Sequence, residues 1–476
     1  MRRKIILIAA QLFLALSCVF AKETATEKQF QLQPLEPITK ENRVLILAPH
    51  PDDEAIACAG VIQEAVKAGA DIRVAYLTNG DHNQLAFIVY EKRITVRKNE
   101  FLHMGRKRRE EAIKAMQLLG VNKDNLTFLG YPDFGTFAIF RDYWHTDRPF
   151  KSLLTRVSSV PYKEDFSFGS PYVGESILED LKRIIRSYKP DKIFVSHPAD
   201  VNRDHTALAL FLEIALADLE KEIKRPLVYP YLVHVAGWPL PRHYHPELNL
   251  FPPKKFQGSQ IKWFTRELSR EQVEMKHQAV LRYKTQTESS AFYLLSFCRK
   301  NELFGSYPEI SLGKPAAQGG FWEGHETKIP SNLYDTFLPE TGDGGNGNVN
   351  LSAERDELRY YLEEGQLVVN IATARKVSPM FGVMFYIFGY SYEKPFALMP
   401  KLRIVTRHKR VLIVDKRKRV KLEGVFMETN EKGLTLKIPL KVLGDPDFLL
   451  VSAKAYSGAL PAETIGFRKI NIKKGD

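Results

Sequence analysis

The sequence predicts an α/β domain, in which helices cover both faces of a mostly parallel sheet, followed by a C-terminal β-sandwich. Three observations lead to this fold class. The chain has 476 residues, more than one domain usually holds. Strand-like and helix-like runs alternate between residue 43 and about residue 235, as in a parallel sheet with helical crossovers. Beyond residue 350 the apolar runs are short and strand-like, which is typical of an antiparallel sandwich.

The alternation begins with RVLILA at 43–48, an apolar and branched run expected of a strand that is covered on both faces. A helix-like run follows at 54–70. The other expected strands lie at 71–80, 125–133, 191–200 and 226–237, and the other expected helices at 106–120, 175–190, 204–223 and 268–304. We therefore expect this domain over 41–310, a linker with a Gly/Asn/Asp tract over 311–349, and the sandwich over 350–476.

The first 21 residues have the pattern of a secretory signal peptide. A basic start precedes an apolar stretch too short for an ordinary membrane span, and a small-residue exit ends at Ala21. We expect cleavage there, a polar leader over 22–40, and a protein exported to the periplasm, the cell surface or the medium. An uncleaved membrane anchor is the alternative. Lipid attachment at Cys18 is disfavoured, because Ala15 stands where a larger aliphatic residue is usual.

Composition excludes general disorder and indicates a basic protein. The apolar fraction is 44% and the charged fraction 26%, as in soluble globular proteins. The net charge of +13 falls to +10 without the three basic residues of the signal peptide, which favours anionic surfaces or polymers as partners. Cys58 and Cys298 remain in the mature chain, and their positions favour two buried thiols over a disulfide framework.

Polar residues follow several predicted strands, where open α/β sheets bind ligands. PHPDDE follows the first strand, and SHPADVNRDH follows a later one. His50, Asp53 and His205 would supply two imidazoles and a carboxylate, a set that suits zinc. Asp52 would then be free to act as a base, with Glu54 at the helix start, where its charge is tolerated. The alternative is that the three acids only begin and cap the helix.

These motifs resemble those of the LmbE-like (PIG-L-type) zinc-dependent de-N-acetylases. PHPDDE is similar to the first motif of that family, and DH at 204–205 to the end of its second motif. Three further segments fit its remaining motifs: RREEAIKAMQLLG from Arg108, FLGYPDFG at 128–135 and KHQAVLRYKTQ at 276–286. The resemblance covers residues 43–305 and implies a Rossmann-like sheet.

The resemblance also implies roles for the residues that match the motifs. Zinc becomes the cofactor, held by His50, Asp53 and His205. Asp52 becomes the general base, and Asp204 supports the ligands from behind. The family acts on N-acetylated sugars and sugar conjugates, so the resemblance implies a substrate of that class.

Asn202 departs from the family pattern, since many members have a histidine there. Asparagine donates hydrogen bonds but delivers no proton, so we expect Asn202 to hold the oxyanion while Asp52 returns the proton to the amine. His197 and Asp200 are open between contact with the ligands or the substrate and simple capping of the loop. Arg108 and Asp133 are open between contact with the substrate and structural pairing. His234 is open in the same way, between lining the pocket and filling the core.

Together these features predict an exported zinc-dependent deacetylase that releases acetate from an N-acetylated amino sugar or glycan. A carbohydrate-binding protein without turnover and a zinc amidase acting on a non-sugar amide are the alternatives. A dinucleotide-dependent oxidoreductase is disfavoured, because no G-x-G-x-x-G follows the first strand.

The C-terminal region loosely resembles carbohydrate-binding domains of the family 9 or DOMON-like type. Its segment 401–421 holds ten Lys or Arg and one acid, Asp415, so part of this charge is expected on one solvent face. We expect a fragment 335–476 to fold alone and to bind an anionic or cell-wall polysaccharide, and we expect no nucleic-acid partner. A solvated basic face without a partner is the alternative.

Overall fold

The computed structural model describes residues 30–82, 98–256, 259, 261–312, 327–328, 357–372, 381–407, 410–431, 433–457 and 460–472. The expected signal peptide, the first part of the expected leader and most of the expected linker, with its Gly/Asn/Asp tract at 340–348, lie outside these residues. None of the helices in the described part of the chain is long and apolar enough to cross a membrane.

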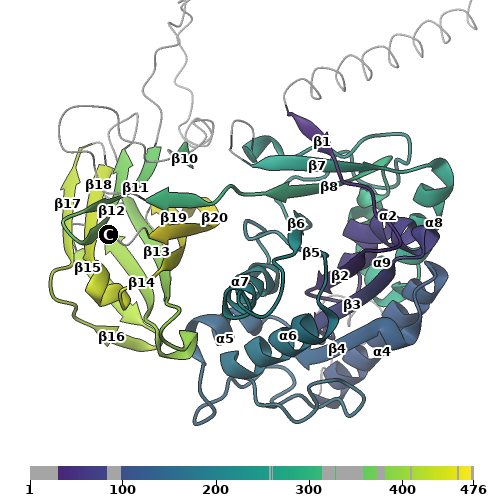
Figure 1. The fold of residues 1–476 in the computed structure, drawn as a ribbon, viewed down its shortest axis with the longest axis horizontal. Helices are drawn as coiled ribbons and strands as arrows, with labels where there is room; N and C mark the ends of the chain where they lie inside the picture. The colour runs from purple at the N-terminus through teal and green to yellow at the C-terminus, as the bar shows by residue number, and fades with distance from the viewer. Residues whose placement is uncertain are drawn as a thin grey trace, which may run out of the picture.

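An eight-stranded sheet forms the first domain, with the order β1-β7-β8-β6-β5-β2-β3-β4 (Figure 1). Its strands are β1 (Leu32–Pro34), β2 (Arg43–Ala48), β3 (Asp71–Thr78), β4 (Leu126–Tyr131), β5 (Lys192–Ser196), β6 (Leu227–Tyr231), β7 (Lys262–Glu267) and β8 (Asn301–Ser306). The strands from β2 to β6 pair in parallel, whereas β8 runs antiparallel to β6 and β7. The predicted mostly parallel sheet is confirmed.

Helices cover both faces of this sheet. They are α2 (Asp53–Ala68), α4 (Lys98–Leu118), α5 (Thr136–Asp142), α6 (Gly174–Tyr188), α7 (Arg203–Asp218), α8 (Arg270–Val280) and α9 (Lys284–Leu294). Alternate residues of β2 enter two different cores: Val44 and Ile46 pack with α2 and α8, whereas Leu45 and Leu47 pack with α6 and α7. The strand is buried on both faces, as its unbroken apolar sequence predicts.

The expected helix over 268–304 is wrong at its C-terminal end, where β8 begins. The sequence of β8 contains several polar residues, so it lacks the apolar pattern by which a buried strand is recognised. Glu302 is buried, and it accepts hydrogen bonds from the backbone amides of Gly60 at 2.8 Å and Val61 at 3.1 Å and from the Lys276 ammonium at 2.8 Å. The expected leader also contributes a strand, β1, which pairs with β7. Both strands depend on partners distant in the sequence, so the local pattern does not predict them.

The second domain is a β-sandwich of two mostly antiparallel sheets, which confirms the predicted fold class. One sheet has the order β10-β11-β12-β18-β17 and the other β16-β15-β14-β13-β19-β20-β9. Their strands are β9 (Ile310–Leu312), β10 (Thr327–Lys328), β11 (Glu357–Glu363), β12 (Gln366–Ala372), β13 (Phe381–Tyr390), β14 (Lys401–Arg407), β15 (Arg410–Asp415), β16 (Lys418–Val420), β17 (Phe426–Asn430), β18 (Gly433–Pro439), β19 (Phe448–Ser457) and β20 (Leu460–Ile472). Strand β9, at the expected start of the linker, pairs in parallel with β20.

The two domains share one apolar core, which lies between α5 and α7 on one side and the sandwich on the other (Figure 1). The ring of Phe137 lies 5.6 Å from that of Tyr386, and the ring of Phe140 lies 5.5 Å from those of Phe388 and Phe396. The C-terminal fragment 335–476 that we expected to fold alone would lack β9 and would expose its own rings of this core, Tyr386, Phe388 and Phe396. Independent folding of that fragment stays a prediction, and the shared core does not favour it.

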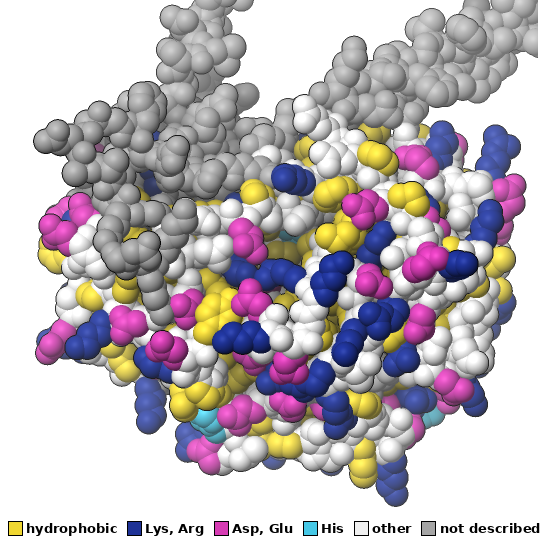
Figure 2. Space-filling model, viewed as in Figure 1, with side chains coloured by type: hydrophobic (Ala, Val, Ile, Leu, Met, Phe, Trp, Pro, Cys, Tyr) yellow, Lys and Arg dark blue, Asp and Glu magenta, His cyan; other side chains and the backbone are white. Residues whose placement is uncertain are grey.

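The basic segment 401–421 is only partly exposed to solvent. Five of its described basic residues are exposed: Arg410, Arg417, Lys418, Arg419 and Lys421. Lys401 is fully buried, and its ammonium lies 4.9 Å from the ring centroid of Trp144. The ammonium of Lys416 donates a hydrogen bond to the carbonyl of Ala397 at 2.9 Å. On the face of the molecule shown in Figure 2, Lys and Arg side chains are interspersed with Asp and Glu. Charges of both signs therefore cover that face.

Candidate metal centre

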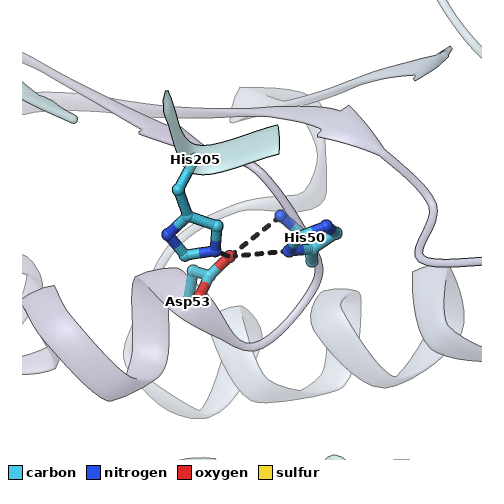
Figure 3. A group of neighbouring side chains, drawn as sticks. All are labelled: His50, Asp53 and His205. Atoms are coloured by element: carbon cyan, nitrogen blue, oxygen red, sulfur yellow. Dashed lines mark hydrogen bonds and ion pairs between the residues drawn. The ribbon is translucent and has the colours of Figure 1, made fainter. Parts of the chain in front are cut away.

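The loops that follow β2, β4 and β5 meet at the carboxyl edge of the sheet. The loop after β2 carries His50 and leads into α2, whose first residue is Asp53, and His205 lies in the first turn of α7. The parallel register places Ile46 of β2 beside Phe194 of β5, so the two strands end side by side. Figure 3 shows the three predicted ligand side chains turned toward one another.

These three side chains converge on one carboxylate oxygen. Oδ2 of Asp53 lies 3.3 Å from Nδ1 of His50 and 3.1 Å from Nε2 of His205. The three ligand atoms lie within 4.8 Å of one another. With zinc–ligand bonds of about 2.0–2.2 Å, tetrahedral ligands lie roughly 3.3–3.5 Å apart. The donor set and its spacing therefore fit zinc and leave one position for water or substrate.

The surroundings of His205 also fit a metal ligand. Its ring is fully buried, and neither nitrogen makes a well-aligned hydrogen bond, although Nδ1 lies 3.3 Å from Oδ2 of Asp200. Asp200 is held by the backbone amides of Val233 at 3.0 Å and His234 at 2.9 Å. Burial by itself lowers the pKa of His205, but Asp53 and Asp200 raise it to about 9. Two carboxylates thus prepare this imidazole to hold a positive charge, either a proton or a metal ion.

The opposite nitrogen of His50 faces two further carboxylates. Nε2 lies 3.2 Å from Oδ1 of Asp133 and 3.4 Å from Oδ2 of Asp204. Asp204 also accepts hydrogen bonds from the backbone amides of Phe134 at 2.6 Å and Thr136 at 3.1 Å, so it holds the loop after β4 against His50. His50, Asp133 and Asp204 form a second group with metal-ligand spacing. Carboxylates that orient one nitrogen of a histidine favour the metal on the other.

Asp52 lies next to the converging side chains in a strained backbone conformation, with a φ of 130°. Its backbone amide donates a hydrogen bond to Glu54 at 3.1 Å. Arg108 donates to the carbonyl of Pro51 at 2.8 Å and to Oδ2 of Asp52 at 3.3 Å. Burial, opposed by the guanidinium of Arg108, raises the pKa of Asp52 to about 7. A carboxyl with that pKa suits proton transfer near neutral pH.

Glu54 and Arg108 are both buried beside the candidate site. Glu54 is fully buried, where burial raises its pKa to about 8 and the hydroxyl of Tyr283 donates a hydrogen bond to it. Glu54 lies in the first turn of α2, as expected, but burial favours its neutral form over the expected charge. For Arg108, the structure favours structural pairing over substrate contact, because its guanidinium ties together the loops after β2 and β3 through the carbonyls of Pro51 and Gly80.

Asn202 is the N-cap of α7. Its side-chain oxygen accepts a hydrogen bond from the backbone amide of Asp204 at 2.9 Å, and its carbonyl accepts one from the amide of Thr206 at 3.1 Å. The cap orders the turn that presents Asp204 and His205. The role of Asn202 as an oxyanion donor stays a prediction, because the cap uses the side-chain oxygen and not the amide nitrogen.

The two other histidines near these loops differ in their surroundings. His197 packs against Tyr307 at 5.0 Å between ring centroids, and its Nδ1 accepts a hydrogen bond from the amide of Ala199 at 3.0 Å. Burial lowers its pKa to about 3, so it is a neutral core histidine. The ring of His234 lies 4.7 Å from that of His205, which places His234 beside the candidate site.

Sequence reasoning missed the groups that support the site through hydrogen bonds. Thr136 donates from both its amide and its hydroxyl to Asp204, and no sequence signal pointed to it. Tyr283 lies in the segment KHQAVLRYKTQ, so the motif itself carried a signal. Within the same motifs, Thr285 donates from its hydroxyl to Glu111 at 2.6 Å, which links α9 to α4.

A family model described as PIG-L, GlcNAc-PI de-N-acetylase, matches residues 45–216, a range that contains all the converging side chains. Residues 45–216 form a PIG-L-type domain. The resemblance inferred from the motifs is thereby confirmed for this part of the chain.

Individual relatives of the PIG-L-type domain are distant. A protein of Bacteroides thetaiotaomicron described as glucosamine-6-phosphate deaminase-like is 24% identical over 283 residues, which are 52% of this chain and 36% of that protein. The chain thus spans about a third of the length of this curated relative.

Two solved structures share part of the fold at low similarity. The N,N'-diacetylchitobiose deacetylase of Pyrococcus horikoshii is 17% identical, with a TM-score of 0.34 over 56% of this chain and 78% of its own. GalB, the 4-carboxy-2-hydroxymuconate hydratase of Pseudomonas putida KT2440, is 14% identical, with a TM-score of 0.32 over 58% of this chain and 100% of its own.

Proposed function

We propose that this chain is an exported, zinc-dependent N-deacetylase that hydrolyses the acetamide of an N-acetylated amino sugar or glycan. The observation that carries the proposal is the convergence of His50 and His205 on Asp53, with the carboxyl of Asp52 next to it, inside a PIG-L-type domain. The description of that family model names de-N-acetylation of a GlcNAc compound, which supports a sugar acetamide as the substrate.

Nδ1 of His50, Oδ2 of Asp53 and Nε2 of His205 would hold the zinc ion. When bound, zinc supplies a Lewis acid that polarises the amide carbonyl and lowers the pKa of a water molecule. The chain's own contribution is orientation. Asp204 faces the other nitrogen of His50, and Asp200 faces the other nitrogen of His205, so both imidazoles are held by carboxylates from behind.

Asp52 is the group placed to move protons. Near neutral pH its carboxyl, with a pKa of about 7, accepts a proton from the attacking water and returns it to the nitrogen as the carbon–nitrogen bond breaks. The products are acetate and a free amine. Arg108 and Glu54 hold this residue through its side chain and its backbone amide, so the base is positioned before substrate arrives.

Export and a glycan substrate are supported by the sequence of the N-terminus. The pattern of residues 1–21 is that of a signal peptide, and an exported enzyme would meet cell-wall, capsular or dietary glycans. Binding of a polysaccharide by the sandwich stays a prediction. The mixed charges on the face in Figure 2 do not favour a purely electrostatic mode of binding there.

Acetate release from a panel of N-acetylated sugars and chitooligosaccharides tests the proposal. The purified protein should hold about one equivalent of zinc, which His205→Ala should lose. A chelator should abolish acetate release, and added zinc should restore it. Asp52→Asn should keep its zinc and turn over about 10²–10⁴-fold more slowly, the usual effect of removing a positioned acid–base group.

Asp191→Asn is the matched control, because Asp191 lies at the opposite edge of the sheet, where it accepts a hydrogen bond from the backbone amide of Arg43 at 2.8 Å. It should bind zinc and turn over like the unmodified protein. Zinc binding without acetate release from any sugar would contradict the proposal and leave an inert carbohydrate-binding protein or an amidase for non-sugar amides. Near-normal turnover by Asp52→Asn would exclude Asp52 as the base.

A further inference from the structure

Strand β20 of the sandwich contacts the loop that leads from β5 into α7. The backbone amide of Phe467 donates a hydrogen bond to the carbonyl of Pro198 at 3.2 Å. Gly466 packs so closely on Ala199 that a Cβ added at Gly466 would lie 2.4 Å from the Cβ of Ala199. Any side chain at position 466 would therefore displace the loop or the strand.

That loop carries Asp200, the carboxylate that faces the candidate ligand His205. Asp200 directly follows Ala199, and its Oδ2 lies 3.3 Å from Nδ1 of His205. The same oxygen accepts hydrogen bonds from the backbone amides of Val233 and His234, which lie beyond the end of β6. The position of this carboxylate is thus set by β20 on one side and by the segment after β6 on the other.

β20 also reaches the other histidine of the centre, through Phe137. The ring centroids of Phe467 and Phe137 lie 6.0 Å apart. Phe137 follows Thr136, whose backbone amide donates a hydrogen bond to Asp204 at 3.1 Å. Asp204 in turn faces Nε2 of His50 at 3.4 Å. Both imidazoles are therefore connected to the sandwich by short chains of direct contacts.

We propose that strand β20 positions the metal centre, with Gly466 and Phe467 as positioning residues. One chain of contacts runs from β20 through Asp200 to His205. The other chain runs from β20 through the loop after β4 to His50. On this basis, the sandwich holds the two imidazole rings in the relative positions that a bound cation requires. The inference rests on the proposed metal centre, but it does not depend on which bond the enzyme breaks.

The other end of the same interface offers a matched control. Phe448 stacks on Tyr390 at 4.4 Å between ring centroids, and the hydroxyl of Tyr390 donates a hydrogen bond to Asp218 at 3.0 Å. Asp218 is the last residue of α7, about 20 Å along the helix from His205. Phe448 and Phe467 both belong to the shared core, so replacing either one removes a ring from the same interface.

The test compares Phe467→Leu with Phe448→Leu in the full chain. Both variants should lose thermal stability to a similar degree, because each leaves a space of similar size in the core. Phe467→Leu should also weaken zinc affinity by about three- to tenfold, measured by chelator competition well below the Tm, and lower kcat with little change in KM. Phe448→Leu should bind zinc and turn over like the unmodified protein.

A readout without metal separates this inference from the proposed function. In the zinc-free protein, the imidazole ¹⁵N chemical shifts of His205 should move in Phe467→Leu and stay in place in Phe448→Leu. The positioning effect then remains measurable even where zinc binding or deacetylation fails. If Phe467→Leu does not fold, Gly466→Ala tests the other contact: the added methyl group should displace the loop before α7 and should likewise move the imidazole shifts of His205. Equal effects of the two phenylalanine variants on these shifts, or no effect of either, would overturn the inference.

Discussion

One oxygen atom organises the candidate metal centre at the residue scale. Oδ2 of Asp53 accepts a hydrogen bond from the backbone amide of His50 at 3.0 Å and faces one ring nitrogen of each histidine. Burial raises the pKa of Asp53, but His205 and His50 hold it well below its ordinary value. This carboxylate therefore stays ionised near neutral pH and offers a lasting negative charge to a cation in a buried site.

Zinc affinity should rise with pH, because protons compete for the same imidazoles. In the zinc-free protein the pKa of His205 is about 9, so at neutral pH its ring binds a proton that zinc must displace. Affinity should increase about tenfold per pH unit between about pH 7 and 9. The slope should be steeper where His50, whose pKa is also raised above its ordinary value, loses its proton in the same range. Chelator competition across this range measures the slope.

The stability of the zinc-free protein provides the control for this prediction. A histidine with a raised pKa contributes stability that is fully present below about pH 6.5 and is lost as the pH rises through about 9. The Tm of the zinc-free protein should therefore fall over that window, whereas the zinc-loaded protein should resist the change. A zinc affinity that does not vary with pH would contradict the assignment of His205 as a ligand.

At the scale of elements, the first turn of α7 combines a cap, a support and a ligand. Asn202 caps the helix, and Asp204 and His205 follow in its first turn. The backbone amides at a helix start have no partner within the helix, so a capping side chain both stabilises the turn and fixes its direction. Any change at this position therefore acts on the geometry of the site as well as on its chemistry.

Asn202→Ser and Asn202→Ala separate capping from catalysis. Serine keeps a side-chain oxygen that can accept the hydrogen bond from the backbone amide of Asp204, whereas alanine has none. The alanine variant should therefore lose about 1 kcal/mol of folding stability, and the serine variant should lose much less. We expect kcat to fall by about 10²–10³ in both variants with little change in KM, because both remove the amide group predicted to hold the oxyanion. A serine variant with full kcat would show that Asn202 is a helix cap only.

At the scale of the whole molecule, an aromatic core joins the two domains. Phe140 of α5 packs against Phe211 of α7 on one side and against Phe388 and Phe396 of the sandwich on the other. Burying a large apolar side chain contributes roughly 1.5–3 kcal/mol. Separating the domains would lose several such contributions at once, a large part of the stability of a typical domain.

The intact chain should accordingly unfold in one cooperative transition, and the separated domains should be unstable. A fragment 41–306 would expose Phe137 and Phe140, and a fragment 307–476 would expose the rings that cover them. Both fragments should bind a hydrophobic dye and melt well below the intact chain, which calorimetry and dye binding measure. Two well-separated transitions in the intact chain, or a fragment as stable as the whole, would contradict this.

The pattern of apolar residues along the sequence was sufficient to predict the elements whose local pattern is strong. The unbroken apolar run of β2 and the long alternation from β2 to β6 predicted a parallel sheet, and the structure has one. Strands β1, β7 and β8 escaped prediction because they are short or polar. Each is stabilised by pairing with another segment and, in β8, by a buried Glu302 whose partners lie on α2 and α8.

By itself, the sequence predicted the candidate side chains of the site and indicated that His50 and Asp53 lie together, because three residues at a strand-to-helix turn bring them into contact. The sequence also predicted His205 as a partner of this pair, and the tertiary structure brings its Nε2 to Oδ2 of Asp53. Only the tertiary structure decided that Glu54 is buried against Tyr283 and that the sandwich contacts the loop before α7. A local sequence pattern predicts the structure of one turn or one strand. Burial of a charged group and its hydrogen-bond partner are set by packing between segments far apart in the chain, and no local pattern contains that information.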